Sequence, residues 1–159
     1  MGSFFLYYII SLLLILPLAS LFIESRLKRG ERFTFELAMK WFVFWAVGIR
    51  LFSAGITQIL HPAFTGSILH LPESGFIIVR ELGFANVCFG LLGIVSVCKA
   101  SWRIPAAFAG GLYLGTAGIQ HVLKLSEGMN TKETIAMISD LFIFLVMVFY
   151  LGSQVVSKK

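Results

Sequence analysis

Long uncharged runs constrain this chain more than any other feature of its sequence. Residues 4–23 contain no charged side chain, and about 20 apolar residues is the length that an α-helix needs to cross a bilayer. Further apolar runs follow at about 41–60, 76–98, 104–123 and 134–152. Only 13% of the residues are charged, against about 25% in soluble domains. The sequence therefore predicts an all-α integral membrane protein, a helical bundle of five transmembrane helices in a single domain over residues 1–159.

The Lys and Arg residues lie in short strips between the apolar runs, and this pattern predicts the orientation of the chain. With the N-terminus outside, the cytoplasmic segments 24–40, 99–103 and 153–159 carry five, two and two of these residues, and the outer segments carry three. Cytoplasmic loops hold the excess of Lys and Arg in membrane proteins, so we expect an outside N-terminus and a cytoplasmic C-terminus. The formal charge of +5 is not gathered on one soluble face, and no nucleic acid is expected as a partner.

Arg50 lies near the middle of the second expected helix. An Arg at the bilayer centre costs about 2.5–3.5 kcal/mol on insertion scales, and its guanidinium does not lose its proton. We therefore expect an acidic partner. Glu81 and Asp140 are the two acids within the expected helices, and either carboxylate suits the planar guanidinium.

Most of the other polar side chains of the expected helices fall in the outer half of the bundle. They are Thr57, Gln58, His61, Asn86, Gln120 and His121. Together with Arg50, Glu81 and Asp140 they predict a polar pocket open to the outside and lined by the second to fifth helices. Such a cluster either fixes the packing of the helices or forms a ligand, cofactor or partner site, and both interpretations stay open. No sequence motif indicates a metal site, and no catalytic residue or cofactor is assigned.

Glycines are frequent in the third and fourth expected helices. Gly83, Gly90 and Gly93 lie in the third, and Gly111 and Gly115 form a small-x-x-x-small pattern in the fourth. Small residues at this spacing let helix backbones approach closely. We therefore expect these glycines at helix contacts inside the bundle.

The run Arg-Glu-Leu-Gly-Phe-Ala-Asn-Val-Cys-Phe-Gly-Leu-Leu-Gly-Ile at 80–94, followed by Gly-Ile-Gln-His at 118–121, resembles an uncharacterised family of small bacterial multi-pass membrane proteins. The family signature Glu-x-Gly-x-Ala-Asn-x-x-x-Gly is matched by Glu81, Gly83, Ala85, Asn86 and Gly90, with His61 before and His121 after. The resemblance covers roughly residues 45–123, and the chain is more loosely similar to DoxX-like four-helix proteins. Gln120 separates Gly118 and Ile119 from His121, which departs from the Gly-His of the family pattern. The resemblance implies a helical protein of the bacterial inner membrane without a known activity, in which Glu81, Asn86, His61 and His121 act together.

The expected function is of the binding or accessory type, with the outer pocket holding a small hydrophobic ligand, a lipid or a partner subunit. Little of the chain lies outside the expected helices, so an independent active site is not expected. The expected partners are the lipid bilayer and a membrane-protein partner or second copy. One alternative is a quinone- or haem-linked redox enzyme or subunit, with His61 and His121 as haem ligands or Glu81 as a proton-transfer group. A further alternative is a small transporter or channel in which Arg50 meets an anionic substrate.

Overall fold

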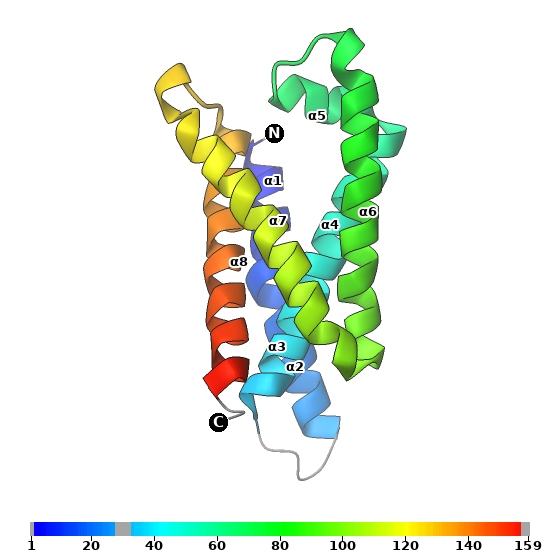
Figure 1. Cartoon of the computed structure of the whole chain (residues 1–159), viewed down its shortest axis with the longest axis vertical. Helices are drawn as coiled ribbons and strands as arrows, with labels where there is room; N and C mark the ends of the chain where they lie inside the picture. The colour runs from blue at the N-terminus through cyan, green and yellow to red at the C-terminus, as the bar shows by residue number, and fades with distance from the viewer. Residues whose placement is uncertain (1, 28–32, 157–159) are drawn as a thin grey trace.

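The computed structural model describes residues 2–27 and 33–156, and within these ranges every regular element is a helix (Figure 1). The first long segment consists of α1 (Gly2–Ile10), the π-helix η1 (Ser11–Ile15) and α2 (Leu16–Leu27). The second consists of α3 (Phe35–Phe42), the π-helix η2 (Val43–Ile49) and α4 (Arg50–Leu60). The rest of the chain forms α5 (Pro62–Ile68), η3 (Glu73–Gly75), α6 (Phe76–Cys98), η4 (Ala100–Trp102), α7 (Arg103–Leu123), η5 (Leu125–Glu127) and α8 (Thr131–Val156). The predicted all-α class is confirmed.

Four helical segments are long and apolar enough to cross a membrane. They are Gly2–Leu27, Phe35–Leu60, Glu73–Cys98 and Thr131–Val156, each of 26 residues. The remaining expected segment, 104–123, is also a helix, the 21-residue α7, but it is not one of these four. Its glycines and its polar end at Gln120 and His121 make α7 less apolar than the others. All five predicted segments are therefore confirmed as helices. Four of them are long and apolar enough to cross a membrane, so the predicted count of five crossings is not confirmed.

Two helices begin earlier in the chain than expected, because a side chain caps the N-terminus of each. The second segment begins at Phe35 because the Thr34 hydroxyl accepts a hydrogen bond from the Leu37 amide (3.2 Å), as an N-cap does. The last helix begins at Thr131, after Asn130 Oδ1 accepts from the amides of Lys132 and Glu133 (both 3.0 Å). The stretch 61–75 lies between two of the expected helices, where no helix was predicted, but its first part forms α5. Pro62 occupies its first turn, where a proline favours a helix.

The two ends of the bundle differ in how closely the helices approach. The N-terminus and α5 lie at one end, called the α5 end, and the C-terminus and the start of α3 lie at the other, called the α3 end (Figure 1). Toward the α5 end, α7 leans away from α6, whereas the two helices meet at the α3 end (Figure 1). The backbones of α6 and α7 are therefore farther apart at the α5 end than at the α3 end.

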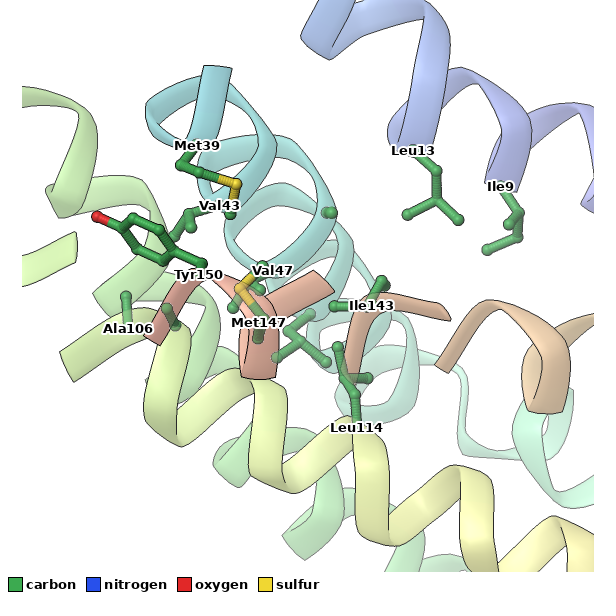
Figure 2. Close-up of a cluster of buried hydrophobic side chains, with 13 residues drawn as sticks. Ile9, Leu13, Met39, Val43, Val47, Ala106, Leu114, Ile143, Met147 and Tyr150 are labelled. Atoms are coloured by element: carbon green, nitrogen blue, oxygen red, sulfur yellow. The ribbon is translucent and has the colours of Figure 1, made fainter. Parts of the chain in front are cut away.

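Buried hydrophobic side chains fill the bundle on the α3 side. Val43 and Val47 of η2 pack with Ile143 and Met147 of α8, and all four are fully or almost fully buried (Figure 2). α1 contributes Ile9 and Leu13 to the same cluster, and α7 contributes Ala106, Ala107 and Leu114. The cluster thus joins α1, η2, α7 and α8 into one core.

Glycines lie at the closest helix contacts, as the sequence predicted. A Cβ on Gly93 of α6 would lie 2.5 Å from Gly48 Cα, and a Cβ on Gly83 would lie 2.9 Å from Gly55 O of the second segment. On α7, a Cβ on Gly115 would lie 2.4 Å from the Phe144 ring of α8. These distances are shorter than non-bonded contacts allow. The backbones of α6 and the second segment therefore meet directly, and the Phe144 ring of α8 packs directly on the backbone of α7.

A polar cluster closes the α3 end. The Glu36 carboxylate of α3 accepts hydrogen bonds from Arg103 Nη1 of α7 (3.2 Å) and from the Tyr150 hydroxyl of α8 (3.1 Å). Gln154 Nε2, one turn beyond Tyr150, also donates to Glu36. One carboxylate therefore ties three helices together. Nearby, Glu24 of α2 forms an ion pair with Lys40 of α3 (2.7 Å).

Candidate functional site

A cavity of about 630 Å³ lies among α1, α4, α5, α6, α7 and α8. Ile9 of α1 and Leu114 of α7 line it and also belong to the hydrophobic core (Figure 2), so they form its floor. The cavity extends from this floor toward the α5 end, where Phe64 and Ile68 of α5 line it. Its volume falls within the range of about 300–1,000 Å³ that is typical of small-molecule sites.

Six of the nine predicted pocket residues line this cavity. They are Arg50, Thr57, Gln58, Asn86, His121 and Asp140. The other three, His61, Glu81 and Gln120, do not line it and are exposed. The structure thus brings together side chains from the second to fifth expected helices, but not the full predicted set.

Glu81 lies outside the cavity because of its position around the axis of α6. The buried positions Gly83, Asn86, Gly90 and Gly93 mark the face that packs on the rest of the bundle. Successive residues of an α-helix are about 100° apart, so Glu81, two residues before Gly83, points away from this face. The hypothesis that Glu81 is the partner of Arg50 was therefore wrong.

The structure pairs Arg50 with Asp140, the other predicted candidate. Arg50 Nη2 donates to Asp140 Oδ1 and to Ser139 Oγ (2.9 Å). Ser139 donates its own hydroxyl proton to the Ala136 carbonyl (2.9 Å), so its oxygen is free to accept from Arg50. The exposed fractions of Arg50 and Asp140 are 7% and 5%. The charge of the guanidinium is therefore balanced by a carboxylate that is equally buried.

A second polar contact joins α4 and α6. Asn86 Nδ2 donates to Gln58 Oε1 (2.6 Å), and both side chains line the cavity. The Tyr113 side chain of α7 also lines the cavity. It lies beside the Asn86 side chain and interacts electrostatically with Asp140. Polar groups from α4, α6, α7 and α8 thus surround one part of an otherwise apolar wall.

Two buried polar atoms of this wall lack a hydrogen-bond partner among the described residues. They are Arg50 Nη1, which can only donate, and Asn86 Oδ1, which can only accept. Asn86 is 4% exposed. A buried polar atom without a partner costs about 1–3 kcal/mol. Protein encloses both atoms almost completely, so they lie within the wall and do not face the cavity.

The first helix supplies a wall that the sequence did not predict. Phe4, Phe5 and Tyr8 of α1 line the cavity. The Ser53 hydroxyl donates to the Ile49 carbonyl (2.7 Å), so the Tyr8 hydroxyl donates to Ser53 Oγ and fixes α1 on α4. The tyrosine within an otherwise apolar run was the available signal.

The start of α8 closes the cavity at the α5 end. Asn130 Nδ2 donates to the Ile68 carbonyl at the end of α5 (3.0 Å). Lys132 Nζ lies 4.8 Å from the centre of the Phe64 ring, within the range of a cation–π contact. These two contacts connect α5 to α8 across the cavity, and they are called the α5–α8 clasp below. Glu133, which also lines the cavity, accepts from the Asn130 amide (3.0 Å).

A model of a protein family matches residues 3–159, nearly the whole chain. The chain belongs to this family of unknown function, DUF6790. The match agrees with the predicted resemblance to an uncharacterised family, but it supports neither the bacterial origin nor the likeness to DoxX-like proteins. No curated protein and no solved structure matches the chain.

In this DUF6790 chain, the cavity combines a largely apolar wall with polar side chains from several helices. In the ranges that the structure describes, no three His, Cys, Asp or Glu side chains gather closely enough to hold a metal ion. His121 lines the cavity, whereas His61 is exposed at the junction of α4 and α5. The arrangement can form hydrogen bonds to a small molecule and cover its apolar surface.

Proposed function

We propose that this chain is an integral membrane protein of the binding type, which holds a small hydrophobic molecule or lipid in the cavity at the α5 end. The observation that carries the proposal is the cavity of about 630 Å³, a volume typical of small-molecule sites, whose largely apolar wall includes the polar side chains of Asn86 and His121. A hydrophobic molecule in this cavity would bury its apolar surface against the wall.

The lipid bilayer is the partner that the outer surface fits. Large apolar side chains point outward along several helices, among them Phe22, Ile77, Phe84 and Phe149. In water such a surface would favour association, whereas in lipid it needs no cover. We place the chain in the inner membrane, with the N-terminus outside and the C-terminus in the cytoplasm, because this orientation gives the cytoplasmic segments the excess of Lys and Arg.

In this proposal α7 also crosses the membrane, which gives five crossings in all. Its 21 residues span about 32 Å at 1.5 Å per residue, which matches the hydrocarbon core. Gly111 and Gly115 pack against α8, so part of its surface faces protein and not lipid. A helix in this position needs fewer large apolar side chains than one that lipid surrounds.

Cysteine labelling tests the crossing of α7. Ser101 and Ser126 are exposed at its two ends, and each is changed to Cys in a background with Cys88→Ala and Cys98→Ala. We expect a membrane-impermeant maleimide to label Ser126→Cys in intact cells and Ser101→Cys only after the cells are opened. Labelling of both variants from the same side would show that α7 does not cross.

Mass spectrometry tests the binding function. The protein is purified in lipid nanodiscs, and the molecules extracted from it are compared with those from empty nanodiscs. Ala117 lines the cavity, so Ala117→Phe fills part of it, while Ala19→Phe adds the same group on the exposed face of α2. We expect an enriched molecule in the unchanged protein and in Ala19→Phe, reduced about tenfold in Ala117→Phe. No enrichment in any sample, or equal enrichment in both variants, would contradict the proposal.

The geometry favours binding over the two alternatives. The redox hypothesis needed His61 and His121 at one centre or Glu81 in the pocket, but only His121 lines the cavity. The transporter hypothesis needed the charge of Arg50 for an anionic substrate, and Asp140 already balances this charge. An accessory role beside a partner subunit or second copy is compatible with the binding function and stays a prediction.

A further inference from the structure

We infer that the cavity takes up a hydrocarbon chain of a membrane lipid from the leaflet at the α5 end, while the head group of that lipid stays outside the protein. This inference rests on the proposed binding function and names the part of a lipid that is bound. Three properties of the cavity support it: the place where it reaches the surface, the pairing of its deep polar side chains, and its volume.

The cavity reaches the surface of the protein at two phenylalanine side chains. Among the residues that line it, only Phe4 of α1 and Phe64 of α5 are exposed, by 80% and 44%. Aromatic rings at an opening do not attract a polar solute from water, whereas in lipid they need no cover. The opening between these two rings, called the mouth below, therefore connects the cavity with lipid.

The mouth lies at the α5 end, near the boundary between lipid chains and head groups. Phe4 is in the first turn of α1, which begins at this end, and Phe64 belongs to α5 itself (Figure 1). Lys132 Nζ, from the first turn of α8, lies 4.8 Å from the centre of the Phe64 ring. A Lys near the end of a membrane helix extends toward the interface with water. A chain that enters at the mouth thus belongs to a lipid whose head group lies at this interface.

The polar side chains deep in the cavity are paired with one another. The hydrogen-bonded pairs are Arg50 with Asp140, Asn86 with Gln58, and Tyr8 with Ser53. The unpartnered atoms Arg50 Nη1 and Asn86 Oδ1 are enclosed by protein, and His121 lies in the last turn of α7, away from this depth. A polar group of a ligand would lose its water here without finding a free partner, which is costly. A hydrocarbon chain has no polar group to satisfy, so it fits this wall.

The rest of the wall is mainly apolar. It includes Phe5 and Ile9 of α1, Leu51 of α4, Leu82 of α6 and Leu114 of α7. An empty cavity leaves such side chains without van der Waals partners on one side, and a chain supplies these contacts. Because the surrounding lipid is equally apolar, binding depends on these contacts and on the shape of the cavity.

The volume of the cavity matches a chain without its head group. The cavity of about 630 Å³ holds roughly 20 non-hydrogen atoms if each takes ~30 Å³, the share of one water molecule in the liquid. One chain of a common membrane lipid has a comparable number of atoms, whereas a whole phospholipid has more than twice as many. The head group therefore has to stay at the mouth.

Photolabelling in nanodiscs tests the inference. The probe is a phosphatidylcholine with a diazirine at the end of one chain, and mass spectrometry maps the labelled residues after irradiation. We expect label on Leu51 and Leu114, which line the cavity and are each 3% exposed, and on the outward-facing Phe84. Val47, which is fully buried in the hydrophobic core and does not line the cavity, should stay unlabelled. Label on Phe84 without label on Leu51 and Leu114 would overturn the inference.

Two variants distinguish entry into the cavity from contact at the surface. Ala117→Phe fills part of the cavity, whereas Ala19→Phe adds the same group on the exposed face of α2. We expect Ala117→Phe to reduce the label on Leu51 about tenfold and to leave the label on Phe84 unchanged, and Ala19→Phe to change neither. Equal label on Leu51 in the two variants would overturn the inference. If Ala117→Phe does not fold, the labelling of the unchanged protein decides.

Competition by single-chain lipids tests which part of the lipid is bound. The competitors are hexadecanoyl lysophosphatidylcholine, hexadecanoyl lysophosphatidylglycerol, and the lysophosphatidylcholine with a hydroxyl at the end of its chain. We expect all of them to reduce the label on Leu51 at mole fractions within about threefold, because the head group stays outside and the paired side chains offer the hydroxyl no partner. A tenfold preference for one head group, or a tenfold advantage of the hydroxylated chain, would overturn the inference.

The outcomes separate the inference from the proposed function. The proposed function fails if nanodisc extraction yields no molecule that Ala117→Phe displaces. If such a molecule is found but the probe does not label Leu51 and Leu114, the function stands and the inference fails. A displaced molecule without a hydrocarbon chain would likewise support the function and overturn the inference.

Discussion

The polar groups at the two ends of the bundle have different surroundings. At the α3 end, the half-exposed Glu36 accepts from Arg103, Tyr150 and Gln154 and ties three helices together. At the α5 end, Arg50 and Asn86 are buried, form hydrogen bonds to other side chains and line a cavity. The difference teaches that a polar contact at the edge of an apolar bundle can rely on water, whereas one in its interior depends on its protein partners.

The largest expected difference in stability is between the variants that remove the carboxylates of Asp140 and Glu36. Asp140→Ala leaves the Arg50 charge buried without a partner, which typically costs about 3–5 kcal/mol. Glu36→Ala should cost less, because its side chain is 50% exposed and water replaces the lost contacts. Thermal unfolding in detergent should show a clearly lower melting temperature for Asp140→Ala than for Glu36→Ala.

A double variant checks the cause of that contrast. Arg50→Met with Asp140→Leu removes both charges, so we expect it to recover most of the stability that Asp140→Ala loses. A melting temperature for the double variant as low as that of Asp140→Ala would show that the charge is not the cause.

A substitution at a glycine where two helices meet should have an intermediate effect on the melting temperature. Gly93→Ala would place a Cβ 2.5 Å from Gly48 Cα, and overpacking of this kind typically costs about 1–3 kcal/mol. Gly152→Ala is the matched control, because no atom lies within 4 Å of its Cβ. The control should be neutral or slightly stabilising, since Ala favours a helix. Equal melting temperatures for the two variants would contradict the close approach of α6 to η2.

The smallest expected effect concerns the α5–α8 clasp. Asn130→Ala removes the cap of α8 and the hydrogen bond to the Ile68 carbonyl, and the loss of a cap costs about 0.5–2 kcal/mol. Hydrogen exchange should become faster in α5 and in the first turn of α8, but not at the α3 end. Thr131→Ala, at the next and exposed position, is the control. Faster exchange throughout the bundle would show that the clasp is not local.

The sequence predicted the helices and several cavity residues because lipid restricts what a chain can contain. Arg50, Asn86 and Asp140 were found because polar side chains are rare within apolar runs. Glu81 was wrongly predicted to line the pocket, because the prediction used its position along the helix and not its position around the helix axis. The glycines at 83, 90 and 93 carried this information, since they mark the packed face of α6.

Other parts of the site depend on tertiary contacts that the sequence does not show directly. α5 has only seven residues, too few for a stable isolated helix, and its buried Pro62 and Gly66 show that packing supports it. The wall from α1 depends on the contact between Tyr8 and Ser53, which are 45 residues apart. Tyr8 was a signal within its own apolar run, but nothing in the sequence identified Ser53 as its partner.

The π-helix η2 has a consequence for which changes this site tolerates. It ends at Ile49, directly before Arg50, and its i→i+5 hydrogen bonds place more residues in each turn than an α-helix has. Deleting one residue between Val43 and Ile49 would let this stretch form an ordinary α-helix, which needs fewer residues for the same rotation, so Arg50 would keep roughly its direction toward Asp140. Deleting one residue within α4, which is already an α-helix, would instead rotate Gln58 by about 100° relative to Arg50. Within the family, an alignment gap in the π-helix is therefore compatible with the site, whereas a gap between Arg50 and Gln58 is not.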